Sequence, residues 1–499
     1  MRSLDQYIKQ IEKEISGSSL TSKSKEIGTV LEVKDGVAIL EGLDNAFYGE
    51  IVEFKNGIKG FIIDLMEDSV GVVVLGDYLT ITAGMSVTGT GFILSLPVSE
   101  QLLGRVVDSL GQPQDAGPKL RTTTYYPIER IAAGVIYRYP VNVPLQTGIK
   151  AIDSLIPIGR GQRQLIIGDR VTGKTTIAID TIINQKGQNV ICVYCAIGQK
   201  NSTVANVIDT LKSNDAMDYT IVVNAPAADP VAMQYLAPYS ATAIAEYFLD
   251  QGKDVLVVYD DLTKHSWAYR QISLILRRPA GREAYPGDIF YLHSRLLERS
   301  CRIDKQFGGG SITALPIVET LEGDVSGYIP TNIISITDGQ IFLETELFNN
   351  GIRPAINVGI SVSRVGGNAQ TKAMKQVAGK LKLDLAQYRE LAAFSQFESE
   401  LDSETKQLLN RGSRVTQILK QKKQNVYLLG EEVAVLWAAT KGYLDEIPVA
   451  KIDLFEAKLI QTLRLKGKDI VKKITTSKLL DEESEKQLEK IVKNTVSFL

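Results

Sequence analysis

The sequence of 499 residues contains only two histidines, His265 and His293, and three cysteines, Cys192, Cys195 and Cys301. A metal site built from several histidines is therefore excluded within one chain, and a histidine-based catalytic triad is not expected. Cys192 and Cys195 are separated by two residues, but they fall inside an apolar run that predicts a strand, where alternation turns them to opposite faces. We expect buried, unpaired cysteines of a reducing compartment and no zinc site.

Long hydrophobic runs and an excess of one charge are also absent. No run of about 18 or more apolar residues appears, so no membrane-spanning helix is expected. Lys and Arg total 56 and Asp and Glu total 58, for a net charge of −2. This balance gives no support for a nucleic-acid partner bound through a broad positive field. The N-terminus lacks the pattern of a signal peptide and carries acidic residues early, which argues against a cleaved targeting segment.

The length suggests about two to four domains. Residues 1–24 place apolar side chains on one face of a short amphipathic helix. Residues 25–92 read as short strands separated by close turns, which predicts a small β-barrel. Residues 93–371 alternate apolar strands with helical stretches, the α/β pattern of a mainly parallel sheet. Residues 372–499 lose the strand signal and predict an α-helical domain.

A phosphate-binding loop is predicted at residues 168–175, which read Gly-Asp-Arg-Val-Thr-Gly-Lys-Thr. An apolar strand pattern precedes the loop and a helical pattern follows it, as this motif requires, whereas an ordinary glycine-rich turn needs neither. Backbone N–H groups would face a polyphosphate, Lys174 would reach the β and γ phosphates, and the Thr175 hydroxyl would ligate Mg²⁺. The residues predicted to bind the nucleotide here are Gly168, Asp169, Arg170, Val171, Thr172, Gly173, Lys174, Thr175 and Thr176.

A carboxylate for the Mg²⁺ shell is predicted at Asp260. Residues 254–261 form an apolar strand pattern that ends in Asp260 and Asp261. Ligands bind at the C-terminal edge of the strands in open α/β sheets, and Asp260 would lie there. A pair of solvated turn aspartates is the alternative interpretation. With a phosphate loop upstream, we predict that Thr175 and Asp260 hold the metal.

Several longer motifs extend this interpretation. They are Ile158–Arg163, Gly281–Asp288, Tyr291–Arg299 and Pro354–Arg364. With these motifs, the chain resembles the α subunits of F-type ATP synthases over residues 25 to about 470. Residues 188–194 are closest in character to plastid or cyanobacterial versions.

The resemblance implies a RecA-like P-loop NTPase core, an N-terminal six-stranded β-barrel and a C-terminal helical domain. It also implies a regulatory subunit that binds ATP or ADP with Mg²⁺ and forms an alternating hexamer with the β subunit. The central-stalk γ subunit and the peripheral-stalk δ subunit are further implied partners, the latter through the N-terminal helix. The complex would be attached through its proton-channel sector to the stromal side of a thylakoid membrane. The alternative is the cytoplasmic side of a bacterial inner membrane.

Two positions decide which subunit is implied. Catalytic β subunits carry a glutamate that polarises the attacking water, and the matching residue here is Gln199. An amide cannot take the proton, and general-base help is worth roughly 10²–10⁴ in rate, so slow hydrolysis is expected. Arg364, with Ser361 and Ser363 before it, matches the arginine finger that acts in trans at the β subunit site. From the residues alone, an arginine after a strand is more often a surface ion pair.

Some residues depart from the family pattern and keep other functions open. Val171 stands where the family usually has glutamine, in a loop that needs unusual backbone angles. Gln421 matches the first of two glutamines near the adenine, whereas Lys423 replaces the second and Gln424 lies beside it. One alternative is a homohexameric ATPase motor for secretion or RNA translocation. Such a motor needs a catalytic carboxylate in the same chain, and Gln199 stands at that position here. The other is a scaffold that has lost nucleotide binding.

Overall fold

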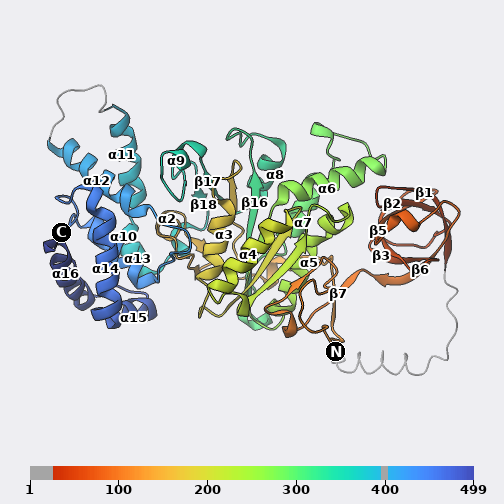
Figure 1. Cartoon of the computed structure of the whole chain (residues 1–499), viewed down its shortest axis with the longest axis horizontal. Helices are drawn as coiled ribbons and strands as arrows, with labels where there is room; N and C mark the ends of the chain where they lie inside the picture. Colours follow the sequence, from red (N-terminus) through yellow and green to blue (C-terminus); the bar gives the residue numbers. More distant parts are fainter. Residues whose placement is uncertain (1–25, 395–402, 499) are drawn as a thin grey trace. The chain divides into compact units, whose positions relative to one another are not determined.

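The structure is a computed structural model that describes residues 26–394 and 403–498 (Figure 1). It divides into two compact units, Met1–Leu94 and Ser95–Leu499, which are described separately. The amphipathic helix predicted for residues 1–24 lies outside the described residues. No helix in the described ranges is both long and apolar enough to cross a membrane.

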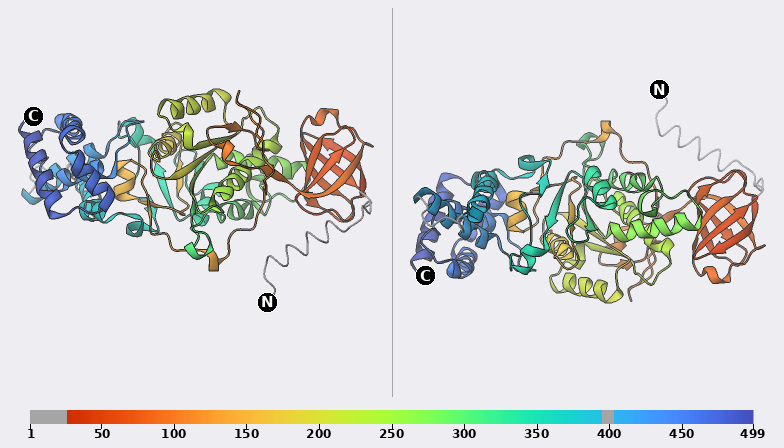
Figure 2. Two further views of the ribbon diagram at one scale, coloured as in Figure 1. Left: turned by 90° about the horizontal axis from the view of Figure 1, so that it is seen from below. Right: turned by 90° about the horizontal axis from the view of Figure 1, so that it is seen from above.

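The first unit is a closed six-stranded barrel with the order β1-β2-β5-β4-β3-β6, which confirms the predicted barrel (Figure 2). All neighbouring strands pair antiparallel. Alternate side chains such as Val30, Val52 and Val72 point inward and are buried. The strands are β1 (Ile27–Lys34), β2 (Val37–Glu41), β3 (Glu50–Phe54), β4 (Lys59–Leu65), β5 (Val70–Leu75) and β6 (Ser86–Ile93).

The second unit is built on an eight-stranded sheet with the order β18-β17-β12-β16-β15-β13-β14-β8. All pairs are parallel except β17 with β18, so the predicted mainly parallel sheet is confirmed. The strands are β8 (Val106–Val107), β12 (Leu165–Gly168), β13 (Val190–Ile197), β14 (Thr220–Ala225), β15 (Asp254–Asp260), β16 (Ser311–Glu319), β17 (Gly339–Leu343) and β18 (Val362–Ser363). Two small pairs accompany it: β7 (Ser95–Pro97) with β9 (Tyr125–Pro127), and β10 (Pro144–Leu145) with β11 (Ile158–Gly159).

Helices connect the parallel strands and lie on both faces of the sheet (Figure 1). Right-handed crossovers place α3 and α4 on one face and α5, α6 and α8 on the other, because the strand order reverses after β14. Cys192 and Cys195 on β13 are buried and unpaired, as expected. The helices are α2 (Lys150–Leu155), α3 (Lys174–Ile183), α4 (Asn201–Ser213), α5 (Val231–Leu249), α6 (Leu262–Ile275), α7 (Ile289–Leu297), α8 (Tyr328–Ile336) and α9 (Thr345–Asn349).

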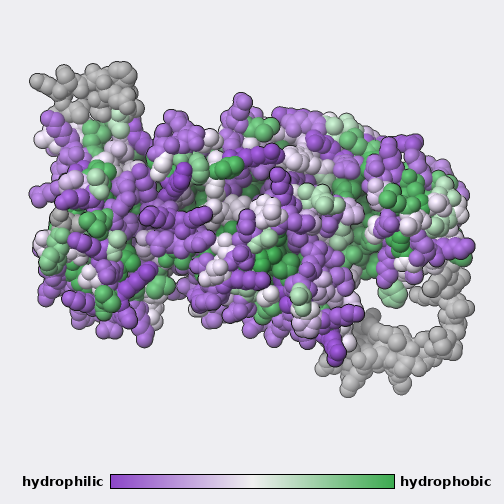
Figure 3. Space-filling view, viewed as in Figure 1, coloured by the Kyte–Doolittle hydropathy of each residue, from purple (hydrophilic) through white to green (hydrophobic). Residues whose placement is uncertain are grey.

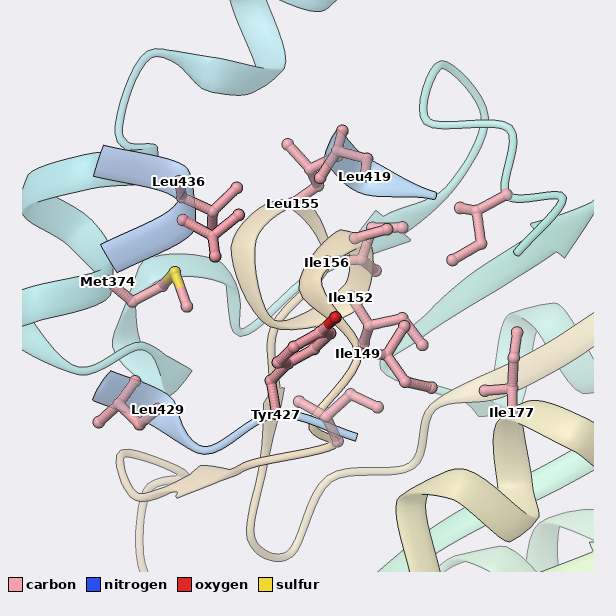
Figure 4. Close-up of a cluster of buried hydrophobic side chains, with 14 of the residues drawn as sticks. Ile149, Ile152, Leu155, Ile156, Ile177, Met374, Leu419, Tyr427, Leu429 and Leu436 are labelled. Atoms are coloured by element: carbon pink, nitrogen blue, oxygen red, sulfur yellow. The ribbon is translucent and has the colours of Figure 1, made fainter. Parts of the chain in front are cut away.

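The C-terminal part is helical, as predicted, and shares one hydrophobic core with the sheet region. Figure 4 shows part of this core: Ile152 of α2 and Ile156 just after it lie beside Tyr427, in one cluster with Met374 of α10 and Leu436 of α13. The helices are α10 (Lys372–Ala378), α11 (Leu381–Phe394), α12 (Ser403–Leu419), α13 (Leu429–Thr440), α14 (Ile452–Lys466), α15 (Lys468–Ser477) and α16 (Glu482–Ser497).

A buried cluster of charged groups lies between α2 and the helices α13 and α14. Lys150 is fully buried and pairs with Glu456. The Asp153 carboxylate accepts hydrogen bonds from Thr147 N (3.0 Å), Thr147 Oγ1 (2.8 Å) and Gly148 N (3.0 Å). These donors hold the turn that leads into α2.

Glu432 of α13 faces Asp153 but has no such donors. Both of its carboxyl oxygens are buried and receive no hydrogen bond from any N–H or hydroxyl group of the described residues. Burial, and then the charge of Asp153, raise the pKa of Glu432 well above its usual value. Burial also raises the pKa of Asp153 to about 6. These shifts favour the protonated carboxyl at Glu432, which could then donate to Asp153.

This pair makes stability depend on pH in one direction. Folding raises the pKa of Glu432, so its stabilising contribution is complete below the unfolded pKa and is lost as the pH rises through the folded pKa. One proton changes the free energy of unfolding by at most about 1.4 kcal/mol per pH unit. The Glu432→Gln variant keeps a donor beside Asp153 at every pH. We therefore expect its melting temperature to fall less than that of the wild type when the pH is raised from neutral to alkaline. Calorimetry of the full chain measures this difference.

Glu431 provides the control, because it is also buried but pairs with Arg464 at 2.6 Å. Glu431→Gln is expected to lower the melting temperature at each of these pH values. An unchanged pH dependence in Glu432→Gln would contradict the shared proton.

Candidate nucleotide-binding site

The predicted phosphate loop lies between the end of β12 and the start of α3. Gly168 must be glycine because a Cβ there would lie 2.4 Å from the carbonyl oxygen of Leu343 on β17. Gly173 has φ +98° and immediately precedes the helix. The loop therefore brings free N–H groups of the first turn of α3 to one edge of the sheet, which is a suitable site for an anion.

Lys174 is buried and bonded within the loop. Its Nζ donates to the carbonyl oxygens of Gly168 (2.8 Å) and Asp169 (2.6 Å). Burial lowers the pKa of Lys174, and the carboxylates around it, first Glu319, oppose that effect. The ammonium group is thus held inside the loop that the sequence assigns to the phosphates.

Asp169 braces the loop from outside. Its Oδ1 accepts hydrogen bonds from Thr320 Oγ1 (2.7 Å) and Gly323 N (2.8 Å), and its Oδ2 accepts one from Thr345 Oγ1 (2.9 Å). Desolvation alone would raise the pKa of Asp169, but these hydrogen bonds outweigh it and lower the pKa. The carboxylate thereby ties the loop to the turn after β16 and to α9.

The remaining loop side chains have different surroundings. Arg170 is exposed, and its Nε pairs with Glu319 at 3.0 Å. The Thr172 hydroxyl donates to the carbonyl oxygen of Asp169 at 2.8 Å, and Thr176 is half-buried. The Arg170 side chain is therefore held by an internal ion pair.

Val171 carries the unusual backbone angles that the sequence suggests. It has φ +65° and is 84% exposed. A β-branched residue in the left-handed region is strained by about 1–3 kcal/mol. The exposed Val171 side chain makes little contact that could offset this strain. The rest of the loop, which surrounds Lys174, therefore maintains the backbone conformation of Val171.

The predicted metal ligands lie next to each other. The Thr175 hydroxyl donates to Asp260 Oδ2 at 2.7 Å, and Asp260 is the last residue of β15 and only 3% exposed. Asp260 also accepts hydrogen bonds from Tyr194 OH (Oδ2, 2.9 Å) and Gln199 Nε2 (Oδ1, 2.9 Å). Thr175, Gln199 and Asp260, which are far apart in the chain, thus form one cluster.

Asp261 follows in the chain but has a separate role. It accepts a hydrogen bond from Lys264 N (2.8 Å) at the start of α6 and pairs with Lys264 Nζ at 2.9 Å. Burial raises the pKa of Asp261 to about 6. Within the described ranges, no group of three or more His, Cys, Asp or Glu could hold a metal ion by itself. A metal here would therefore need phosphate oxygens as well.

The amide of Gln421 is already bonded to groups outside the phosphate loop. Its Oε1 accepts from Lys150 N (3.0 Å), and its Nε2 donates to the carbonyl oxygens of Gly148 (2.7 Å) and Asn425 (2.8 Å). Gln421 therefore connects the turn before α2 to its own loop.

The neighbouring Lys423 and Gln424 are exposed. Gln424 N donates to Asp180 Oδ1 of α3 at 3.0 Å, and burial raises the pKa of Asp180 to about 6. This segment therefore packs beside the helix that begins at the phosphate loop.

Arg364 lies at the other end of the strands, where β17 begins. Ser363 pairs with Gly339, the first residue of β17, whereas Gly168 at the phosphate loop pairs with Leu343, its last residue. Four residues of strand separate these ends by roughly 13 Å. The guanidinium of Arg364 is exposed and has no hydrogen bond or ion pair with any described residue.

The two serines before Arg364 hold its segment. Ser361 Oγ donates to the carbonyl oxygen of Asn357 (2.6 Å), and Ser363 Oγ donates to that of Pro157 (2.7 Å). Both hydroxyls therefore fix the backbone on the N-terminal side of Arg364.

Tyr194 is the residue of the cluster that the sequence did not indicate. It lies inside an apolar strand pattern, where an aromatic residue is usually part of the core. The only available signal is its register on β13, where it pairs with Val258, two residues before Asp260. That register requires the tertiary pairing of two strands and cannot be read from either strand alone.

We expect Asp169→Ala to weaken ATP binding by the full chain about tenfold, because part of the binding energy must then order the loop. Asp169→Asn is the control, since its amide oxygen can still accept from Thr320 and Gly323. Equilibrium titration with ATP measures both variants. Wild-type affinity in Asp169→Ala would contradict the bracing role.

Comparison with known proteins places this geometry in a family. Sequence models match at residues 23–91 (ATP synthase alpha/beta family, beta-barrel domain), 148–363 (ATP synthase alpha/beta family, nucleotide-binding domain) and 370–495 (ATP synthase alpha/beta chain, C terminal domain). The chain is also similar to the ATP synthase subunit alpha of Petrotoga mobilis, with 56% identity over 492 residues that cover 98% of this chain and 97% of the relative. The chain therefore belongs to the ATP synthase alpha/beta family.

Proposed function

We propose that the chain is the non-catalytic, nucleotide-binding α subunit of a proton-transporting F-type ATP synthase, which makes ATP from ADP and phosphate. The similarity over nearly the whole length to a protein named ATP synthase subunit alpha is the observation that carries this proposal. The phosphate loop with Lys174, Thr175 and Asp260 supports the binding of ATP or ADP.

The surroundings of Gln199 support a site that binds nucleotide without splitting it efficiently. Its amide donates to Asp260 Oδ1 at 2.9 Å. An amide in this place cannot accept the proton of an attacking water, so general-base catalysis is missing. The related homohexameric motors for secretion or RNA translocation need that base in the same chain, and this alternative is therefore disfavoured.

The residues present fit a Mg²⁺ ion. Thr175 Oγ1 and Asp260 Oδ2 are hard oxygen ligands, 2.7 Å apart, at the edge that carries the phosphate loop. Bound there with the nucleotide, Mg²⁺ would neutralise phosphate charge. Thr175 and Asp260 would hold it, and the other residues of the phosphate loop would bind the phosphates.

Arg364 would act on a neighbouring subunit. It lies at the edge of the sheet away from its own phosphate loop, and its exposed guanidinium has no partner among the described residues. Within its own chain the guanidinium therefore has no transferring phosphoryl group to stabilise. An arginine finger supplied in trans, with Ser361 and Ser363 holding its segment, suits this position.

The surface supports assembly with other chains. Hydrophobic patches lie among the polar areas in Figure 3, and Ile131, Val135 and Ile136 are 95%, 87% and 79% exposed in one segment. Such surface usually marks an interface between proteins. We propose β subunits in an alternating hexamer, with the γ subunit as central stalk. The δ subunit would bind the segment 1–24, which lies outside the described residues.

For the location, we propose the cytoplasmic side of a bacterial inner membrane, reached through the proton-channel sector. The similarity to a bacterial protein supports it. The thylakoid location and the plastid or cyanobacterial character suggested by residues 188–194 gain no such support.

We expect Arg364→Ala to lower steady-state ATP hydrolysis by the assembled complex by roughly 10³–10⁵, because the transition state loses its positive partner. Nucleotide bound by this chain's own site should remain. The measurement compares turnover with the nucleotide content of the purified complex.

Arg121→Ala is the matched control, since Arg121 is also exposed. It should retain turnover. Normal turnover in Arg364→Ala would overturn the trans role of this residue.

Alone, the chain is expected to hydrolyse ATP roughly 10²–10⁴-fold more slowly than the assembled complex, because it lacks the general base. In the assembled complex, native mass spectrometry should find this chain in a mixed hexamer with a second kind of chain. Rapid hydrolysis by a homohexamer would favour the motor alternative instead.

A further inference from the structure

The Asp260 carboxylate has three hydrogen-bond donors, and only Thr175 belongs to the phosphate loop. Tyr194 OH donates to Oδ2 at 2.9 Å, and Gln199 Nε2 donates to Oδ1 at 2.9 Å. Each carboxylate oxygen therefore has a donor from outside the loop. Together these two donors prevent the carboxylate from rotating.

Both outside donors come from β13 and the turn that follows it. Tyr194 pairs with Val258 and Ala196 pairs with Asp260, so Tyr194 and Asp260 are diagonal neighbours on one face of the sheet. An aromatic side chain is long enough to reach a diagonal neighbour. Gln199 lies three residues beyond Ala196, at the same edge. The strand next to β15 thus supplies the support for the carboxylate at the end of β15.

The environment makes this support necessary. Tyr194 is 1% exposed and Asp260 is 3% exposed. The Tyr194 phenol is a hydrogen-bond donor, and its hydroxyl is directed at Oδ2 of this carboxylate. Lys264 pairs with Asp261 instead, and Lys174 Nζ is bonded to backbone carbonyls. Hydrogen bonds therefore compensate the buried charge of Asp260.

We propose that Tyr194 and Gln199 are positioning residues for Mg²⁺: they hold both oxygens of Asp260 so that it and Thr175 present their ligand atoms together. This inference rests on the proposed Mg²⁺ site. It also assigns a role to the amide that replaces the catalytic glutamate, which serves the metal carboxylate rather than a water. Loss of a hydrogen-bond partner of a metal-binding carboxylate typically costs about 10–100-fold in metal affinity.

The test measures ATP binding by the full chain with Mg²⁺ and with EDTA, and takes the ratio of the two affinities. Tyr194→Phe removes one hydroxyl oxygen and keeps the ring. We expect the ratio to fall at least about tenfold, while the affinity in EDTA stays within about twofold. A wild-type ratio in Tyr194→Phe would overturn the role of Tyr194.

Tyr259→Phe is the matched control. Tyr259 lies on β15, is fully buried, and shares a 2.8 Å hydrogen bond with Thr242 Oγ1. The substitution removes the same atom from the same sheet without touching Asp260, so the ratio should not change. An equal fall in both variants would mean general loosening of the sheet and would overturn the proposal.

A second variant keeps the test open if Tyr194→Phe does not fold. Gln199 is half-buried at the rim of the site, and Gln199→Met removes its amide at similar length. The ratio should again fall at least about tenfold. An unchanged ratio would overturn the role of Gln199.

Asp260→Asn separates this inference from the proposed metal site. If Asp260→Asn abolishes the effect of Mg²⁺ and Tyr194→Phe does not change it, the metal site stands and the positioning role of Tyr194 fails. If Asp260→Asn leaves the effect of Mg²⁺ intact, the metal site itself fails and the inference fails with it. The electron paramagnetic resonance spectrum of Mn²⁺ bound with ATP gives a second readout, which should broaden in Tyr194→Phe.

Discussion

Parallel pairing of β12, β16, β15 and β13 is the constraint on which the rest of the structure depends. It brings the C-terminal ends of these strands to one edge, so the phosphate loop, Gln199 and Asp260 meet there although long segments separate them in the chain. The one antiparallel strand, β18, has the opposite effect. It carries Arg364 to the other edge, away from the nucleotide site of its own chain. The phosphate loop and the segment of Arg364 therefore lie at opposite ends of the strands of a single sheet.

Carboxylates at this sheet and beside it are satisfied in different ways. Asp260 has three hydrogen-bond donors, and Asp169 has three that tie the loop to the turn after β16 and to α9. Glu432 has none among the described residues, and burial raises its pKa, which favours the protonated carboxyl. Whether each carboxyl is favoured in its charged or its protonated form follows from the number of N–H and O–H groups near it, because a buried charge without a partner is costly. The same rule thus connects the geometry of the nucleotide site with the pH dependence of stability.

Much of this architecture can be predicted from local patterns. The barrel strands, the strand and helix around the phosphate loop, and Asp260 at a strand end all follow from residue spacing over a few turns. Other features could not be predicted in this way. The hydrogen bonds of Asp169 to the turn after β16, of Tyr194 to Asp260 and of Gln421 to the turn before α2 each join segments from different parts of the chain. They depend on strand register and on the docking of α2 against the C-terminal helices.

The sequence by itself determined which chemistry is present: a phosphate loop with Lys174 and Thr175, a carboxylate at Asp260, an amide at position 199 and an arginine at position 364. Tertiary structure alone decided how these groups are arranged. It directed the amide of Gln199 to Asp260, added Tyr194 as a second support and left the guanidinium of Arg364 without a partner among the described residues. The physical reason is that residue type and spacing determine what a side chain can donate or accept. Its actual partner depends on which strands pair and in which direction they run.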